Sequence, residues 1–96
     1  MNNFIEITVD DFQKLDLDPC FPRKDTLYKI IFSNGYRFIL NGEIHCEFGP
    51  ADVLDELHTG HYYLNDKFLF TELFLIKNNI KPPTNINEIK KIMLLM

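Results

Sequence analysis

Histidine and cysteine supply the residues of this chain best suited to bind a metal ion. His58 and His61 are separated by two residues, and His45 with Cys46 would add two zinc ligands. Adjacent residues on a strand point to opposite faces, so His45 and Cys46 are not expected to converge on one ion. His58 falls at the predicted end of a helix, where a cation stabilises the helix dipole. The sequence therefore predicts no metal and no cofactor.

The segment around His45 also offers the nearest approach to an acid–base cluster. Glu43 and Glu47 flank His45 at spacings of two residues, so the three side chains share one face of a predicted strand. Such a pattern is more often a solvated strand face. Cys46 lies on the apolar side, and Cys20 stands in a proline-rich loop where nothing marks it as activated. We expect no enzymatic activity, and a small enzyme built on His45, Glu43 and Glu47 is a minor alternative.

Carboxylates are the most usable functional signal. The formal net charge is −4, which disfavours direct binding to nucleic acid. Two clusters stand out, one near the first predicted helix and one on the second: Asp10, Asp11, Asp16 and Asp18, then Asp52, Asp55 and Glu56. Ordinary solubility charge is one interpretation of them. The other is an acidic surface that meets a basic site on a partner protein, such as one that binds nucleic acid.

The elements that position these residues begin with an antiparallel β-meander in the centre of the chain. Alternating apolar residues and turn residues predict three strands, at 27–33, 36–40 and 43–48. Asn34-Gly35 and Asn41-Gly42 join them, and each pair predicts a type I′ turn with positive φ at both residues. A shorter hairpin follows, with its turn at Asn65-Asp66.

Helix signals flank these hairpins. Thr8, Thr71 and Asn85 are placed to cap helices, Pro50 suits a first helical turn, and Gly60 would end that helix as a left-handed cap. About four short helices, packed mainly on one face of the sheet, are expected beside the strand at 4–9. The prediction is an α+β fold in one domain over residues 1–96. Its hairpins span about 27–70 and its C-terminal helices about 71–96.

The last five residues, 92–96, are all apolar, so they cover more than one face of a helix. Part of this segment must therefore be deeply buried or meet another chain. Ile92, Leu94, Leu95 and Met96 are candidate interface residues, with a homodimer among the options. An alternative to which we give equal weight is that the end of this helix is buried between the sheet and the helix at 71–79.

A degenerate internal repeat relates segments 40–45 and 64–69, which are offset by 24 residues. The stretch 36–51 resembles degenerate MORN-like (membrane occupation and recognition nexus) strand-turn-strand repeats of uncharacterised phage and giant-virus proteins. Their pattern is roughly aromatic-x-x-Asn-Gly-x-x-His-Arg-x-x-Gly-Pro-Ala. The matching residues are Tyr36, Phe38, Asn41, Gly42, His45, Gly49, Pro50 and Ala51. Cys46 replaces the usual Arg, and the second copy keeps only the aromatics and Asn65. The resemblance implies a phage-derived or viral protein that binds rather than catalyses.

The leading hypothesis is a non-enzymatic protein-binding module. Within that class we favour a phage or mobile-element inhibitor, of the anti-defence or immunity type, whose acidic surface meets a basic site of a host or rival factor. A structural or assembly protein that forms homo-oligomers is the rival hypothesis. The apolar runs are too short to span a bilayer and the N-terminus lacks a signal-peptide pattern. We therefore expect a cytoplasmic location, in the host cell if the protein is phage-encoded.

Overall fold

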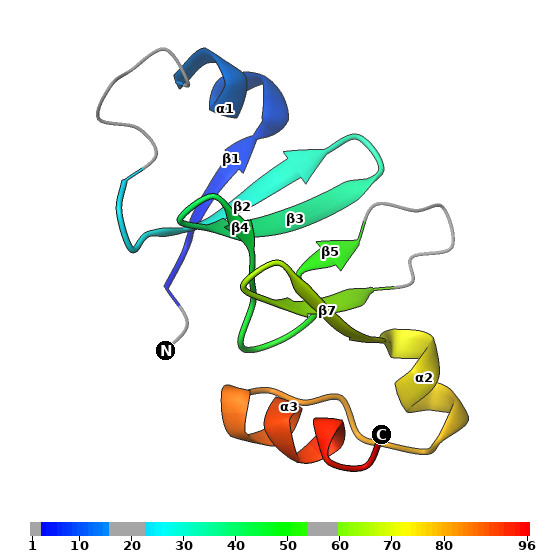
Figure 1. Cartoon of the computed structure of the whole chain (residues 1–96). Coiled ribbons are helices and arrows are strands. Elements are labelled where there is room, and N and C mark those ends of the chain that lie inside the picture. The colour runs from blue at the N-terminus through cyan, green and yellow to red at the C-terminus, as the bar shows by residue number, and fades with distance from the viewer. Residues whose placement is uncertain (1–2, 16–22, 54–59) are drawn as a thin grey trace.

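A computed structural model describes residues 3–15, 23–53 and 60–96 of the chain. Seven strands form one mixed sheet, and three helices accompany it (Figure 1). The elements in chain order are β1 (Ile5–Thr8), α1 (Val9–Leu15), β2 (Leu27–Phe32), β3 (Gly35–Leu40), β4 (Glu43–Ile44), β5 (Asp52–Val53), β6 (His61–Leu64), β7 (Lys67–Thr71), α2 (Glu72–Lys77) and α3 (Ile86–Met93). The α+β prediction is confirmed, whereas the simple meander and about four helices are not.

The sheet departs from a meander because β3 has two partners on one edge. The strand order is β1-β2-β3-β5-β6-β7, with β1 parallel to β2 and β4 paired to β3. Ile39 of β3 lies opposite Ile44, and Tyr36 lies opposite Val53 of β5. The predicted strand at 43–48 therefore shortens to two residues. The predicted helix at 50–58 is also wrong at its start, where β5 forms; residues 54–58 lie outside the described ranges.

A change of backbone partner explains the short β4. The N–H of His45 still donates to Phe38 O of β3 at 3.1 Å. The next N–H, that of Cys46, donates instead to Tyr63 O of β6 at 3.2 Å. The chain thus crosses from β3 to β6 at this point. The first half of β3 is left open for β5, and its hydrogen-bonding groups are satisfied there.

The two later hairpins turn as the sequence predicts. Asn41 and Gly42 have φ of 50° and 80°, and Asn65 and Asp66 have φ of 50° and 66°. Both turns are left-handed at both central residues, as a type I′ hairpin requires. The internal repeat is therefore visible in the backbone at these two turns.

The first hairpin turns one residue earlier than predicted. Phe32 pairs with Gly35, so Ser33 and Asn34 are the two loop residues. Gly35 has a φ of 155° and opens β3. The predicted Asn34-Gly35 turn is wrong because the pairing register, not the Asn-Gly dipeptide, sets the loop here.

Helices cover both faces of the sheet, so the expectation of one covered face is wrong. The ring of Phe12 in α1 meets Tyr28 of β2 edge-on at 6.1 Å, which defines the α1 face of the sheet. The pairing register places Tyr62 and Phe70 on the opposite face, where they pack with Ile89 of α3. Figure 1 shows α1 next to β1 at one end of the sheet and α3 beyond β7 at the other end. Both faces are covered because β2 and β6 bury large side chains on different faces of the sheet. Each face therefore needs a helix to shield these side chains from water.

The opposite face carries two apolar clusters. One lies between the β6–β7 hairpin and the two C-terminal helices and contains Tyr62, Leu69, Phe70, Leu75, Ile89 and Ile92. The other lies under the loop after β4 and contains Phe38, Cys46 and Ala51. A fully buried side chain of the size of Tyr62 or Phe70 stabilises the fold by about 1.5–3 kcal/mol relative to an exposed one.

Local sequence signals fix the start of each helix. Thr8 accepts from the Asp11 N–H at 3.2 Å, Thr71 from the Phe74 N–H at 3.1 Å, and Asn85 from the Glu88 N–H at 3.0 Å; these are the three predicted caps. No helix within the described ranges is long and apolar enough to cross a membrane.

Gly60 is required for a different reason from the predicted left-handed cap. A Cβ atom on Gly60 would lie 2.6 Å from Pro50 Cβ and would also collide with the Glu72 side chain. The Glu72 carboxylate accepts the Gly60 N–H at 2.8 Å, and Gly60 O accepts the Glu72 N–H at 2.9 Å. A glycine at this position therefore permits close approach of the chain before β6 to the start of α2.

Candidate functional site

The predicted acid–base cluster is a structural contact. His45 is buried, with 7% of its surface exposed, and both of its ring nitrogens are engaged. Its Nδ1 accepts the Asn65 N–H at 3.0 Å, so Nε2 carries the proton and donates to Glu47 at 2.8 Å. Glu43 is half-buried at the start of β4. The solvated strand face expected here does not form, because the chain crosses to β6 after Ile44.

His45 joins one hairpin to the next. It lies four residues after Asn41, the first turn residue of the β3–β4 hairpin, and it reaches Asn65, the equivalent turn residue of the β6–β7 hairpin. This contact gives a physical reason for the spacing of Asn41, Gly42 and His45 in this chain. Leu69 occupies the equivalent position in the second copy and is buried in the apolar cluster beside α3.

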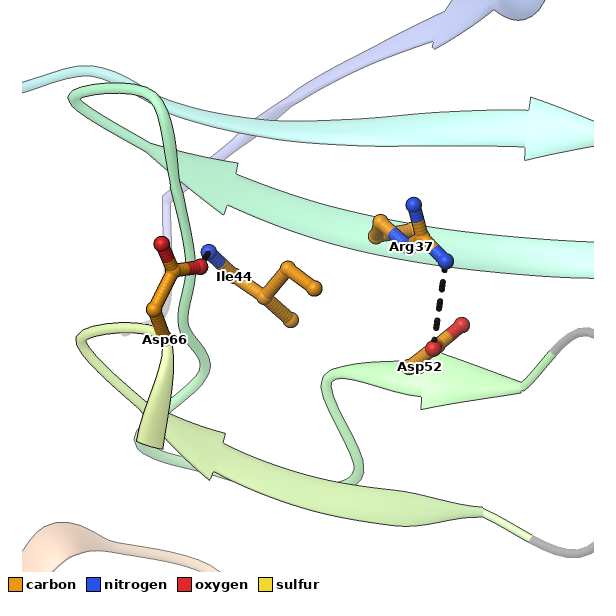
Figure 2. A network of polar contacts seen from close by, with 4 residues as sticks. All are labelled: Arg37, Ile44, Asp52 and Asp66. Atoms are coloured by element: carbon orange, nitrogen blue, oxygen red, sulfur yellow. Dashed lines mark hydrogen bonds and ion pairs between the residues drawn. The ribbon is translucent and has the colours of Figure 1, made fainter. Parts of the chain in front are cut away.

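Two further polar contacts hold the turns together. Asp66 accepts the Ile44 N–H at 2.7 Å through its carboxylate and donates its own N–H to Ile44 O at 2.9 Å (Figure 2). The β3–β4 turn is also tied to the segment before β2, because Asp25 and Asn41 form two hydrogen bonds of 2.8 and 3.0 Å. The polar turn residues therefore form hydrogen bonds that connect neighbouring segments of the fold.

Cys46 belongs to the core, as the alternation of its strand predicts. Only 1% of its surface is exposed, and burial raises the pKa of its thiol to about 11. A thiol in that environment stays protonated and unreactive at neutral pH. Cys20 and His58 lie outside the described residues. Within the described ranges, no group of three His, Cys, Asp or Glu residues is arranged to hold a metal ion.

The structure separates the predicted acidic residues. Asp10 and Asp11 are exposed in the first turn of α1. Asp52 does not lie on an acidic surface, because its side chain is 16% exposed and forms an ion pair of 3.3 Å with Arg37 (Figure 2). The β3–β5 register places these two residues opposite each other, a contact that the predicted helix at 50–58 concealed. Asp16, Asp18, Asp55 and Glu56 lie outside the described residues.

A groove of about 420 Å³ lies between α1 and the sheet. The described residues that line it come from α1, β2, β3 and the turn after β3: Val9, Phe12, Gln13, Ile30, Phe32, Arg37, Ile39 and Gly42. The Nε atom of Arg37 and the Oδ1 atom of Asp52 are buried and have no hydrogen-bond partner among the described residues. Sequence reasoning missed this groove. Its one signal was Arg37, a lone cation in an otherwise apolar strand.

The C-terminal segment divides into a buried and an exposed part. Ile92 is 6% exposed and belongs to the apolar cluster beside α3. Leu94, Leu95 and Met96 are 85%, 72% and 62% exposed. Ile76 of α2 is 71% exposed, although its neighbour Leu75 is buried in the same cluster as Ile92. Ile92 is therefore buried, as the alternative of a buried helix end expects, whereas the three residues after Met93 are exposed.

The chain matches no protein-family model, and no solved structure matches it.

Proposed function

We propose that this chain is a non-enzymatic protein-binding module whose interface is the apolar end of α2 and α3. The apolar end is defined by Leu73, Ile76, Leu94, Leu95 and Met96, all of which are at least 47% exposed. Exposed apolar groups that gather on one surface usually mark interaction sites, and our proposal is that these five residues act together in this way. Because α2 and α3 pack on one buried cluster, their exposed residues are held by a common, ordered base.

Charge indicates the kind of surface that the apolar end would meet. Four exposed lysines stand on or beside the same two helices: Lys77, Lys81, Lys90 and Lys91. Lys90 and Lys91 are one helical turn before Leu94 and Leu95, so they lie next to the apolar residues. Interfaces commonly have an apolar centre and a polar rim. The partner surface would therefore be an apolar ridge or pocket flanked by carboxylates.

The finer identity that we propose is an inhibitor, of the anti-defence or immunity type from a phage or mobile element, acting in the cytoplasm. Its support is α1, whose Val9, Phe12 and Gln13 line the groove above the sheet while Asp10 and Asp11 are exposed. These carboxylates are available to a basic site on a second protein surface. A homo-oligomeric assembly protein is the alternative, because the apolar end could equally pack against a second copy.

Affinity capture with two matched variants tests the module. The paired substitutions Leu94→Ser and Leu95→Ser remove the centre of the apolar end, and Leu15→Ser removes an exposed leucine at the end of α1 as the control. We expect the partner, read by mass spectrometry, to be lost with the paired variant and kept with the control. Capture of the same proteins by all three chains, or of none by the wild type, would reject the proposal.

The molecular mass in solution, measured on the same samples, distinguishes a homo-oligomeric assembly protein from a module that binds another protein. A dimer or larger assembly that the paired substitutions dissolve would make a second copy of the chain the partner. A monomer for every variant would direct the search to another protein.

A further inference from the structure

We propose that His45 is a proton-operated latch between the two hairpins: a proton taken up by its ring releases Asn65 and turns the ring toward Asp25 and Glu47. His45 is buried, with 7% of its surface exposed, and its two ring nitrogens have different kinds of partner. The neutral ring satisfies both partners, whereas the protonated ring satisfies only one. The latch shares no residue with the apolar end of α2 and α3, so it stands or falls independently of the proposed interface.

The conflict arises at the Nδ1 atom of His45. The Asn65 N–H donates to this atom at 3.0 Å, and a backbone amide cannot become an acceptor in turn. A protonated imidazole is a donor at both nitrogens, so its Nδ1–H would point at the Asn65 N–H. Imidazole is the side chain that ordinarily takes up a proton between about pH 5 and 8. Acidification over this range therefore opposes the contact with Asn65.

The charged groups around the ring favour its protonation. Two carboxylates line the same pocket as His45, Glu47 of the loop after β4 and Asp25 of the segment before β2, and the described lining holds no lysine or arginine. On the β6–β7 side the nearest charged group is Asp66, whose carboxylate accepts the N–H of Ile44. All three negative charges favour a positive charge on the ring.

The balance of hydrogen bonds also favours release. The Nε2–H of His45 donates to Glu47 at 2.8 Å, and it remains a donor when the ring is protonated. That bond then becomes charge-assisted, and such bonds are roughly twice as strong as neutral ones. Release of Asn65 loses one neutral hydrogen bond, whereas a protonated ring held in place would set two donors against each other. The protonated ring is therefore expected to leave Asn65 and keep Glu47.

The pocket beside His45 has room for the ring. Its volume is about 280 Å³, several times the roughly 30 Å³ that a water molecule occupies in the liquid. Its remaining described lining consists of Asn3, Leu27, Leu40 and Phe48. The ring can therefore turn within a space that already carries the two carboxylates.

Other bonds hold the backbone while the ring moves. Asp66 forms two hydrogen bonds with Ile44, of 2.7 and 2.9 Å, and neither of them involves the imidazole. The Cys46 N–H donates to Tyr63 O at 3.2 Å, which fixes the chain directly after His45. The expected response is thus local: the ring and the Asn65 N–H change their partners, and the two hairpins stay in place.

Two-dimensional NMR of the intact chain tests the latch between about pH 8 and 5. Ring ¹⁵N signals should show His45 protonated only at Nε2 at the upper limit and at both nitrogens at the lower limit. The Asn65 amide should shift with the midpoint of the His45 ring, rather than that of His61, and lose roughly tenfold in hydrogen-exchange protection after correction for the intrinsic rate. The amides of Cys46 and Asp66 should keep their protection.

Three variants separate the latch from a general effect of acid. His45→Gln keeps a carbonyl acceptor but cannot take up a proton, so the Asn65 amide should no longer respond to pH. Glu47→Gln keeps an acceptor for Nε2–H and removes one charge that favours the protonated ring, so the midpoint should fall by about 0.5 pH unit. Glu43→Gln is the matched control, because Glu43 does not line the pocket, and it should leave the midpoint unchanged.

Four results would overturn the inference: an Asn65 amide that stays fixed while His45 takes up its proton, a His45 ring that stays neutral to pH 5, an unchanged response in His45→Gln, or equal midpoints for Glu47→Gln and wild type. Loss of protection at Ile89 with the same midpoint would also reject it, because the buried cluster would then be unfolding. Unfolding curves at pH 8 establish that each variant is folded. If His45→Gln does not fold, Glu47→Gln decides, since Glu47 is exposed.

Discussion

The two ends of the sheet are covered in different ways. At one end α3 buries Ile89 completely and Ile92 almost so, against Tyr62 and Phe70. At the other end α1 has no fully buried residue and stands over a groove. The difference shows that one end of the sheet is tightly packed and the other loosely packed.

The largest loss of stability is expected from a cavity at the tightly packed end of the sheet, beneath α3. Ile89→Ala removes a side chain with 0% exposure and should lower the free energy of unfolding by about 2–5 kcal/mol. Val9→Ala, at the loose end, should cost less than about 1.5 kcal/mol because Val9 is only half-buried. Urea unfolding measures both. Equal losses would mean that the two ends are packed alike.

Alkaline pH should weaken the fold through buried groups on the opposite face. Burial raises the pKa of the Cys46 thiol from an ordinary value of 9.0 to about 11, so the folded state holds its proton more tightly. Its contribution is present below pH 9 and is lost as the pH rises through about 11, by at most about 3 kcal/mol. Burial raises the pKa of Tyr62 to about 12, which extends the loss to higher pH. Unfolding by urea at a series of pH values measures this slope. Cys46→Ala should flatten it between pH 9 and 11, and an unchanged slope would contradict the assignment.

Loss of the hydrogen bond between His45 and Asn65, which joins the two hairpins, should lower stability by an intermediate amount. His45→Ala leaves the Asn65 N–H without its acceptor and should cost about 1–3 kcal/mol in thermal or urea unfolding. Glu47→Ala removes only the half-exposed partner of His45 and is the matched control, with an expected loss below about 1 kcal/mol. If His45→Ala were as mild as its control, the hairpins would be held together by packing alone.

The smallest effect on stability belongs to the acidic turn of α1. Asp10→Lys with Asp11→Lys should change unfolding by less than about 0.5 kcal/mol per site, since both residues are exposed. Association with a basic partner should nevertheless slow and become less salt-dependent. Stopped-flow or surface-based binding kinetics with the captured partner, at a series of salt concentrations, measure the association rate. Unchanged association rates would remove Asp10 and Asp11 from the interface.

Local signals in the sequence predicted local structure well. The caps at Thr8, Thr71 and Asn85 and the left-handed turns at 41–42 and 65–66 depend on neighbouring residues only, and they form, whereas the turn predicted at Asn34-Gly35 does not. Cys46 was placed in the core by simple alternation. These features need no knowledge of the rest of the chain.

The features that the sequence missed depend on contacts between distant segments. The pairing of Arg37 with Asp52 and of His45 with Asn65 follows from the point where the chain leaves β3 for β6. No local pattern marks that point, because residues 43–48 alternate as if they formed one continuous strand. The groove could not be predicted either, since its walls come from α1, β2 and β3. Exposure in the C-terminal segment was undecided for the same reason.

Photo-crosslinking from the apolar end tests the central claim most directly. A photoreactive amino acid at Leu95 would be compared with the same residue at Leu15, an exposed position at the other end of the molecule, in cells that express the protein. The account predicts a discrete protein adduct from position 95 and none from position 15. Equal labelling from both positions, or no protein adduct from position 95, would contradict it.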